Sequence, residues 1–405
     1  MDLVIIILLC IISLALIWQF VGYPLFMAVL ALYYNKNELK DYDYEPYISI
    51  VVPTYNEEST IGKRLYNLFE LNYPKDRYEI IVVDSGSNDG TADIVKRIQV
   101  ENGSNSVPLK LAMENERRGK ASAINLGKRN ANGDIVLVTD ANCLFNLDVL
   151  KEIGPHFKDS RVGAVGGRYV VLTPSNAITL SEEYRWDIEY LMLRGESVLD
   201  SAAFFHGEIN AWRKDLVDAD VRMLSEDLDM CVSIRKKGYR VIYEPGAVVY
   251  ELAPATSIDQ FKKRKRTGIG TIQNIFKHIT YFLPPKDLYA LIIFPSHKTI
   301  PMLSPFLFLA VAILYLLAWN ISIIAIHFLL TLLIFIILLI ILMSVKSMLI
   351  ENRSPKQHLS LLFIPRVVYY VLLNEYIILS AWLGYFFGSY SVLWDKVEST
   401  RNEAC

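Results

Sequence analysis

The hydrophobic positions of the chain form two long apolar ends and an alternating middle. At the amino end, residues 3–32 are interrupted only by Ser13, Gln19, Gly22 and Pro24. A helix of this length, at about 1.5 Å per residue, exceeds the roughly 30 Å of a bilayer's hydrocarbon core. The run is too long for a signal peptide and lacks both a basic start and a small-residue cleavage site. We therefore expect an amino-terminal transmembrane helix over residues 1–34.

The carboxyl end carries three further apolar runs. Residues 300–319 and 321–345 are long enough to form a transmembrane hairpin, and residues 359–385 are a third candidate. The third run contains Arg366, Asn374 and Glu375, so its first part, around Pro365, is expected at the interface or facing protein. We expect about three helices over residues 299–390, followed by a tail over residues 391–405.

The middle of the chain alternates between short β-branched runs and segments with helical spacing. Strands are expected at 48–52, 79–83, 109–113 and 135–139, with helices at 60–71, 90–99 and 121–130 between them. This alternation is typical of a parallel sheet covered by helices on both faces. It predicts an α/β domain over residues 45–255.

Polar loops follow three of the expected strands, where parallel sheets bind their ligands. They are Pro53–Glu57, Asp84–Thr91 and Asp140–Asn142. Such residues are also common in turns and helix caps, so a single loop of this kind carries little information. Three of them at one edge of the sheet indicate a ligand site.

Charge and cysteine content exclude several classes of protein. The formal net charge is −2, and the densest basic run, residues 262–266, lies beside the carboxyl-terminal apolar region, which argues against a nucleic-acid-binding protein. The four cysteines are scattered without the spacing of a zinc site or a disulfide framework. Lys36 and Lys40 follow the amino-terminal run, and Lys346, Arg353 and Lys356 follow residues 321–345. The positive-inside rule therefore places the middle of the chain in the cytoplasm of a multi-pass membrane protein.

Six motifs follow one another along the middle of the chain: VVPTYNE, VVDSGSNDGT, RRGKASAIN, VTDAN, HGEINAWR and SEDLDMCVSIRKKGY. Their order resembles that of the membrane-embedded family 2 glycosyltransferases, which include cellulose, chitin, hyaluronan and poly-N-acetylglucosamine synthases. The resemblance covers about residues 48–273. It implies a Rossmann-like GT-A domain, amphipathic interface helices over residues 256–298, and a lipid bilayer as partner.

The resemblance also implies a nucleotide-sugar donor, most commonly a UDP-sugar. Asp84 matches the acid that binds the base, and Lys120 matches a lysine that approaches the phosphates. The loop that lines the nucleoside contains Thr54, Tyr55 and Glu57. Asp140 and Asn142 stand at the family's metal-binding pair, which implies Mg²⁺ or Mn²⁺, although Asn142 offers a neutral carbonyl in place of a second carboxylate.

Asp227, in the motif Ser225-Glu226-Asp227, matches the general base that takes the proton of the acceptor hydroxyl, with Glu226 beside it. One base without a second nucleophile implies inversion. Ser225 is also a good helix N-cap, so capping alone remains an alternative explanation of the acidic pair. The acceptor side matches His206, Gly207, Glu208 and Trp212; an aromatic residue in an apolar strand is more often part of a core, and Trp212 is open to both interpretations.

The last motif is incomplete. Processive members carry Gln-x-x-Arg-Trp, and this chain has Lys263 and Thr267 at the first and last positions while Arg266 is retained. Arg266 either contacts the donor diphosphate, or its basic run binds anionic lipid, or both.

Three functions remain open. The chain either extends a polysaccharide, or adds one sugar to a lipid carrier or lipid-linked glycan, or is a catalytically inactive scaffold.

Overall fold

The computed structural model describes residues 2–33, 40–103, 107–172, 177–252, 257–318, 363–388 and 390–393, with a few isolated positions between 324 and 335. The chain forms two compact units. The sheet unit comprises Asn35–Ser175, Phe204–His278 and Gly388–Cys405, and the helical unit comprises Met1–Tyr34, Asn176–Ala203 and Ile279–Phe387. These units differ from the boundaries expected at 45–255 and 256–298, because residues 176–203 group with the apolar terminal segments and residues 256–278 group with the sheet.

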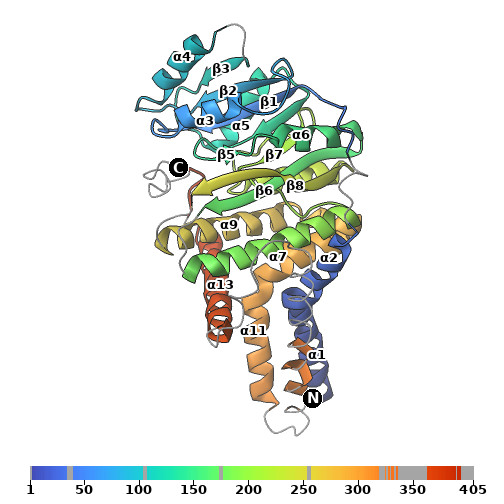
Figure 1. Ribbon diagram of the computed structural model, residues 1–405. Coiled ribbons are helices and arrows are strands. Elements are labelled where there is room, and N and C mark those ends of the chain that lie inside the picture. Colours follow the sequence, from blue (N-terminus) through green and yellow to red (C-terminus); the bar gives the residue numbers. More distant parts are fainter. Residues whose placement is uncertain are drawn as a thin grey trace. The chain divides into compact units, whose positions relative to one another are not determined.

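The sheet unit contains eight strands and the helices that connect them (Figure 1). In chain order its elements are β1 Ile48–Thr54, α3 Ile61–Phe69, β2 Tyr78–Asp84, α4 Thr91–Asn102, β3 Leu109–Met113, α5 Lys120–Asn130, β4 Ile135–Val138, β5 Leu144–Phe145, α6 Val149–Ile153, a 3₁₀ turn Gly154–Lys158, β6 Val162–Leu172, β7 Asn210–Arg213, α8 Glu226–Lys236, β8 Arg240–Leu252 and α9 Ser257–Lys277. The expected alternation from β1 to β4 is confirmed.

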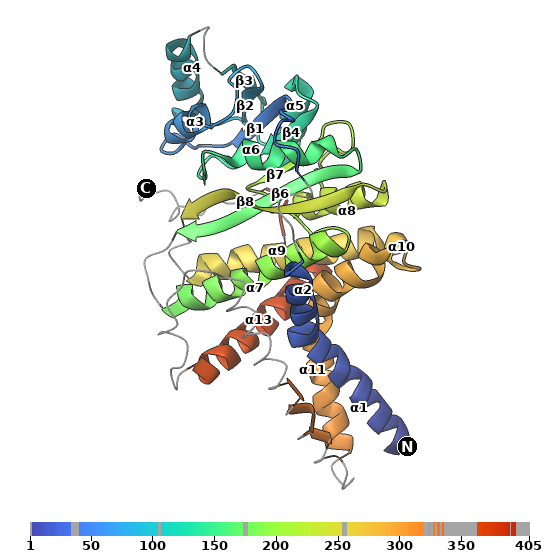
Figure 2. The same cartoon turned by 45° about the vertical axis from the view of Figure 1, so that its right-hand side comes forward.

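The strand order is β3-β2-β1-β4-β7-β6-β8-β5. The first four strands are parallel, with Thr54 opposite Asp84 and Val51 opposite Val138. Strand β7 then runs antiparallel to both β4 and β6, and β5 runs antiparallel to β8, so the sheet is mixed rather than wholly parallel. The long strands β6 and β8 lie side by side in parallel, as Figures 1 and 2 show.

Helices pack on the sheet because its strands are apolar on both faces. Strand β2 is buried along its whole length, and β1 along nearly all of it. Helix α5 packs on β1 and β2, and α6 and α8 pack on β8. At Gly127 of α5 the approach is so close that an added Cβ would lie 2.3 Å from Cγ1 of Val51. This packing holds α5, whose first residue is Lys120, against β1 and β2.

The helical unit contains the apolar segments. Its elements are α1 Asp2–Ile17, a π-helical turn Trp18–Gly22, α2 Tyr23–Ala31, α7 Ala177–Leu199, α10 Ile279–Phe282, π-helical turns Tyr289–Ile293 and Pro295–Thr299, α11 Ile300–Leu317 and α13 Phe363–Phe386. Helices α1 and α11 pack against each other, as both ribbon views show. The 23 residues of α7, which sequence reasoning did not predict as a helix, pack against α2.

Two segments of 29 residues, Leu3–Ala31 and Tyr289–Leu317, are long and apolar enough to cross a membrane. They coincide with the first two expected spans, although the second begins about ten residues earlier than the sequence suggested. Most of the expected span at 321–345 lies outside the described residues. The last expected span corresponds to α13, of which Val371–Phe386 is a shorter apolar helix.

A buried carboxylate ties the helical unit together. Glu196 of α7 is fully buried and accepts hydrogen bonds from the Tyr23 hydroxyl at 2.6 Å, from Nδ1 of His297 at 2.6 Å and from the Ala203 amide at 2.8 Å. These bonds join α2, α7 and the π-helical turn before α11. A buried carboxylate with this many donors is satisfied, so we interpret Glu196 as a structural connection.

A matched pair of glycines tests the packing of α5. We expect Gly127→Ala to lower the stability of the sheet unit by about 1–3 kcal/mol, since the new methyl group overlaps Val51. Gly62→Ala in α3 is the control, because its Cβ would meet Ile94 at an ordinary 3.8 Å, and the change should raise stability by up to about 1 kcal/mol. Thermal unfolding midpoints of the two variants check the pair, and equal shifts would contradict the packing described.

Candidate active site

The loops after β1 and β2 are fastened to each other by their polar residues. The Asn56 amide donates to Oγ of Ser87 at 2.8 Å, and Oδ1 of Asn56 accepts from the Asn88 amide at 2.8 Å. The Glu57 amide donates to Oγ1 of Thr91 at 2.8 Å. Several polar groups of these loops therefore bond to one another and hold the edge of the sheet in one conformation.

Asp84 lies at the end of β2 and is fully buried. Its Oδ1 accepts from the hydroxyl and, at 3.3 Å, from the amide of Ser87, while Oδ2 has no hydrogen-bond partner among the described residues. A buried carboxylate oxygen without a donor is costly, so this oxygen is suited to accept a hydrogen bond from a ligand. Thr54, opposite Asp84, is buried and donates to the Val83 carbonyl at 3.1 Å.

The other two residues expected at the nucleoside lie in the loop after β1. The Tyr55 ring lies 4.2 Å from the Arg117 guanidinium carbon, in a cation–π contact. Glu57 is buried and accepts from the Thr60 hydroxyl at 2.9 Å, at the start of α3. Tyr55 thus joins the loops after β1 and β3, whereas the Glu57 carboxylate bonds the Thr60 hydroxyl within its own loop.

Asp140, Lys120, Gly207 and Asp227 converge although they come from four segments of the chain. Nζ of Lys120 lies 2.5 Å from Oδ1 of Asp140 and donates to the Gly207 carbonyl at 3.1 Å. A Cβ built on Gly207 would lie 3.4 Å from Oδ2 of Asp227 and 3.4 Å from Nζ of Lys120. The lysine therefore connects the expected metal-binding acid to the segment that lies against the expected base.

The acidic pair at the start of α8 has an unusual ionisation. Burial and the charge of Glu226 raise the pKa of Asp227 to about 7, although the Leu228 amide, 2.8 Å from Oδ1, favours the ionised form. Burial also raises the pKa of Glu226, which Lys120 opposes. Ser225 makes no side-chain capping bond, so capping alone does not account for the acids that follow it.

A second group of polar side chains borders the loop after β4, Asp140–Asn142, where the metal is expected. Nδ2 of Asn142 donates to Oε1 of Glu251 at 2.8 Å, and the Tyr169 hydroxyl donates to Oε2 of the same carboxylate. Nζ of Lys263 lies 3.3 Å from Oε2 of Glu251 and 3.6 Å from Oε1 of Glu208. Burial raises the pKa of Glu208, and Glu251 and Asp140 add to the effect while Lys263 opposes it.

Arg266 is directed toward the described part of the carboxyl-terminal segment. Its guanidinium donates to the carbonyls of Ser391 at 2.6 Å and Val392 at 2.9 Å. A Cβ on Gly119, which precedes Lys120, would lie 3.9 Å from side-chain atoms of Val392 and Leu393. The carboxyl-terminal segment thus lies beside the two positions at which a diphosphate is expected.

Comparison with known proteins identifies the family. Residues 135–401 match the model described as Glycosyl transferase family group 2, and residues 49–220 match Glycosyl transferase family 2. The chain belongs to glycosyltransferase family 2.

Individual relatives agree with this assignment. The glycosyltransferase is 30% identical over 266 residues to a poly-beta-1,6-N-acetyl-D-glucosamine synthase of Staphylococcus aureus. The matched region covers 63% of this chain and 62% of that protein. The chain is 28% identical over 249 residues to the probable glycosyltransferase YdaM of Bacillus subtilis, 60% of this chain and 59% of the relative. The matches thus span less than two thirds of either relative's length.

Among solved structures, the glycosyltransferase is similar to the mannosyltransferase PcManGT from Pyrobaculum calidifontis, solved in complex with GDP-Man and Mn²⁺. The TM-score is 0.67 at 25% sequence identity, with 95% of this chain and 100% of that chain covered. Together with the family match, this likeness confirms the expected GT-A fold.

Two residues expected on the acceptor side of the glycosyltransferase lie in packed surroundings. Trp212 is fully buried in β7, opposite Val136 of β4 and Ala164 of β6, so its indole belongs to the core and cannot stack on a sugar. That expectation is corrected in favour of the core interpretation. The His206 ring is buried and stacks on Tyr169 with centroids 5.6 Å apart.

Sequence reasoning missed the residues that support the loop after β4. Arg64 of α3 is fully buried, lies 4.1 Å over the Phe145 ring and donates to Oγ1 of Thr139 at 2.6 Å. Asn67 bonds both the amide and the carbonyl of Phe145. Burial lowers the pKa of Arg64 to about 10. No motif marks these residues, because their role depends on the helix–loop packing.

The site of the glycosyltransferase holds more acids than bases. Five carboxyl groups interact with three cations: Asp140, Glu208, Glu226, Asp227 and Glu251 with Lys120, Lys263 and Arg266. Their mutual repulsion and burial explain why several acids have raised pKa values. A divalent cation would match this excess of negative charge.

The raised pKa of Asp227 predicts a pH-dependent stability. The folded protein retains this proton to about pH 7, whereas the reference value is 3.8, so the stabilising contribution is complete below the reference value and is lost as the pH rises through about 7. Asp227→Asn should therefore raise the unfolding midpoint, by more at pH 8 than at pH 5. Asp93→Asn, at an exposed carboxylate of α4, is the control. A midpoint difference for Asp227→Asn that does not change with pH would contradict the raised pKa.

Proposed function

We propose that the protein is an inverting membrane glycosyltransferase that moves a sugar from a nucleotide-sugar to a hydroxyl of a growing polysaccharide or lipid-linked acceptor at the cytoplasmic face. The observation that carries the proposal is the convergence of Asp140, Lys120 and Asp227 around Gly207. Glycosyl transfer requires an acid that can hold a metal ion, a cation that can bind phosphate, and a base. Asp140, Lys120 and Asp227, whose pKa is about 7, are proposed for these three roles.

For the donor, we propose a UDP-sugar with the base near Asp84 and the diphosphate between Lys120 and Arg266. Asp84 ends β2 and Asp140 follows β4, and β1 lies between these two strands, so the strand spacing gives a separation of about 10 Å. That separation fits a nucleoside diphosphate. The unpartnered Oδ2 of Asp84 supports the position of the base.

For the metal, we propose Mg²⁺ or Mn²⁺ held by Asp140. Asp140 is partly exposed in the site and pairs with Lys120, whose long flexible side chain could move away when an ion binds. Within the described part of the chain, no three His, Cys, Asp or Glu side chains lie close enough to hold an ion by themselves, so donor phosphates would complete the shell. The bound ion would stabilise the leaving diphosphate. The amide nitrogen of Asn142 donates to Glu251, so we propose that Asn142 supports the loop rather than binding the metal.

In the proposed reaction Asp227 accepts the proton of the acceptor hydroxyl as that oxygen attacks the anomeric carbon. The bond from this carbon to the diphosphate oxygen breaks, and the nucleoside diphosphate leaves with the electron pair. Lys120 and Arg266 compensate the charge of the leaving group. Glu226 maintains the pKa of Asp227 near neutrality.

The acceptor and the product length remain alternatives. The likeness to a poly-N-acetylglucosamine synthase supports extension of a polysaccharide. Thr267 supports single addition to a lipid carrier or lipid-linked glycan, because its hydroxyl bonds the Lys263 carbonyl within α9 and offers no aromatic surface to a sugar. The apolar segments Leu3–Ala31 and Tyr289–Leu317 support a membrane location for either reaction.

Nucleotide release by the purified full-length protein tests the proposal. We expect UDP-N-acetylglucosamine or UDP-glucose to be consumed with Mg²⁺ or Mn²⁺ but not in excess chelator, and GDP-mannose to be left unused. Asp227→Asn should lower the rate about 100-fold or more, while Asp93→Asn should not change it. Full turnover of Asp227→Asn, or full turnover without a divalent ion, would refute the proposal. The length of the product separates polymer synthesis from single addition.

The pH dependence of the rate provides an independent test. Because only ionised Asp227 accepts a proton, kcat/KM should rise with pH and level off above about 7. Glu226→Gln removes a negative neighbour, so the half-maximal point should move to lower pH. A shift in the opposite direction, or a flat profile in the wild type, would exclude Asp227 as the base.

A further inference from the structure

Helix α9 is attached to the beginning of α8 by side-chain bonds that no sequence motif predicts. Oε1 of Gln273 accepts from the Leu224 amide at 3.0 Å, and Nδ2 of Asn274 donates to the Ser225 carbonyl at 3.2 Å. Leu224 and Ser225 directly precede Glu226 and Asp227. The last turns of α9 therefore contact the backbone from which the expected base projects.

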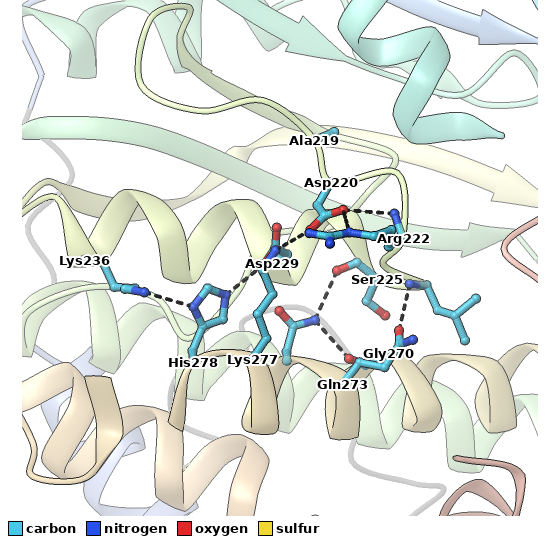
Figure 3. A network of polar contacts seen from close by, with 12 residues as sticks. Ala219, Asp220, Arg222, Ser225, Asp229, Lys236, Gly270, Gln273, Lys277 and His278 are labelled. Atoms are coloured by element: carbon cyan, nitrogen blue, oxygen red, sulfur yellow. Dashed lines mark hydrogen bonds and ion pairs between the residues drawn. The ribbon is translucent and has the colours of Figure 1, made fainter. Parts of the chain in front are cut away.

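A buried charged group completes the attachment, as Figure 3 shows. Oδ1 of Asp229 accepts from Nε2 of His278 at 2.8 Å and lies 2.6 Å from Nζ of Lys277. Asp229 and His278 are each 2% exposed. Lys277 also reaches Asp220 at 2.9 Å, and Nδ1 of His278 lies 3.5 Å from Nζ of Lys236. Oδ1 of Asp229 and both ring nitrogens of His278 thus have polar neighbours.

The two helices also approach each other closely. A Cβ on Gly270 would lie 2.2 Å from Oγ and 2.9 Å from the amide nitrogen of Ser225. Only glycine permits this distance. The approach leaves no freedom for the start of α8 to shift toward α9.

We propose that Asp229 and His278 are positioning residues, which with Gly270 fix Asp227 relative to the cations that α9 carries. Arg266 and Lys263 lie on α9, and Asp227 lies two residues before Asp229 on α8. One rigid helix thereby sets the separation between the base and the proposed diphosphate-binding arginine. The inference rests on the proposed function, in which both groups act on one donor. A displacement of about 1 Å at a reacting group lowers the rate by up to about 100-fold.

The first experiment compares His278→Ala with His278→Gln, whose amide can still donate to Asp229. With the donor selected by the nucleotide-release assay, His278→Ala should lower kcat about tenfold or more while the Kd for Mn²⁺-UDP stays within about twofold. His278→Gln should recover most of the loss. The double variant Asp229→Asn with His278→Ala should have a kcat no lower than that of the less active single variant, because the two substitutions remove the same contact. Gly270→Ala should also lower kcat.

Lys237→Ala is the matched control, since it lies at the exposed end of α8 and contacts the Leu216 carbonyl rather than α9. It should leave kcat unchanged. The proposal is overturned if His278→Ala keeps full kcat, if His278→Gln is as impaired as His278→Ala, or if kcat, Mn²⁺-UDP binding and thermal stability fall together.

Amide hydrogen exchange tests the same proposal without depending on sugar transfer. His278→Ala should accelerate amide exchange in the peptide containing residues 225–229 about tenfold or more, whereas peptides from β1 to β4 should not change. If the wild type transferred no sugar but this pattern appeared, the proposed function would fail and the positioning role would stand. Unchanged exchange at 225–229 would overturn the positioning role.

Discussion

The ion pair between Lys120 and Asp140 is the interaction on which the site depends. It joins the first turn of α5 to the loop after β4, and the same ammonium bonds the carbonyl of Gly207, a residue that lies close to Asp227. Without a cation at this point, the carboxylates that four segments bring together would repel one another at short range. The fold provides that cation from a helix whose packing against β1 leaves no space for a side chain at Gly127.

Burial and the close carboxylates lower the stability of the fold, and they also raise the pKa of Asp227. Burial and Glu226 bring the pKa of this carboxyl to about 7, where a general base is most effective. In our proposal the contacts of Gln273, Asn274 and His278 with the beginning of α8 set the position of this group. In our account, electrostatics determines when Asp227 can accept a proton, and the attachment of α9 determines where it does so.

Strand and helix periodicity predicted β1 to β4 and the helices between them, and the order of the motifs predicted that Asp84, Lys120, Asp140 and Asp227 belong to one site. Local patterns do not reveal contacts that arise from packing across the sheet. Glu251 and Arg64 therefore gave no signal, and Trp212 could be assigned to the core only once β7 lay between β4 and β6. Helix α7 was missed because residues 177–199 mix polar and apolar positions without a clear helical stripe.

A structure of the full-length protein with UDP and Mn²⁺ tests the central claim most directly. Our account predicts Mn²⁺ at about 2.0–2.3 Å from a carboxylate oxygen of Asp140, with the Lys120 ammonium moved from Asp140 to the diphosphate and the uracil bonded to Oδ2 of Asp84. An Asp140–Lys120 pair that stays intact while Mn²⁺ and UDP bind elsewhere would contradict it.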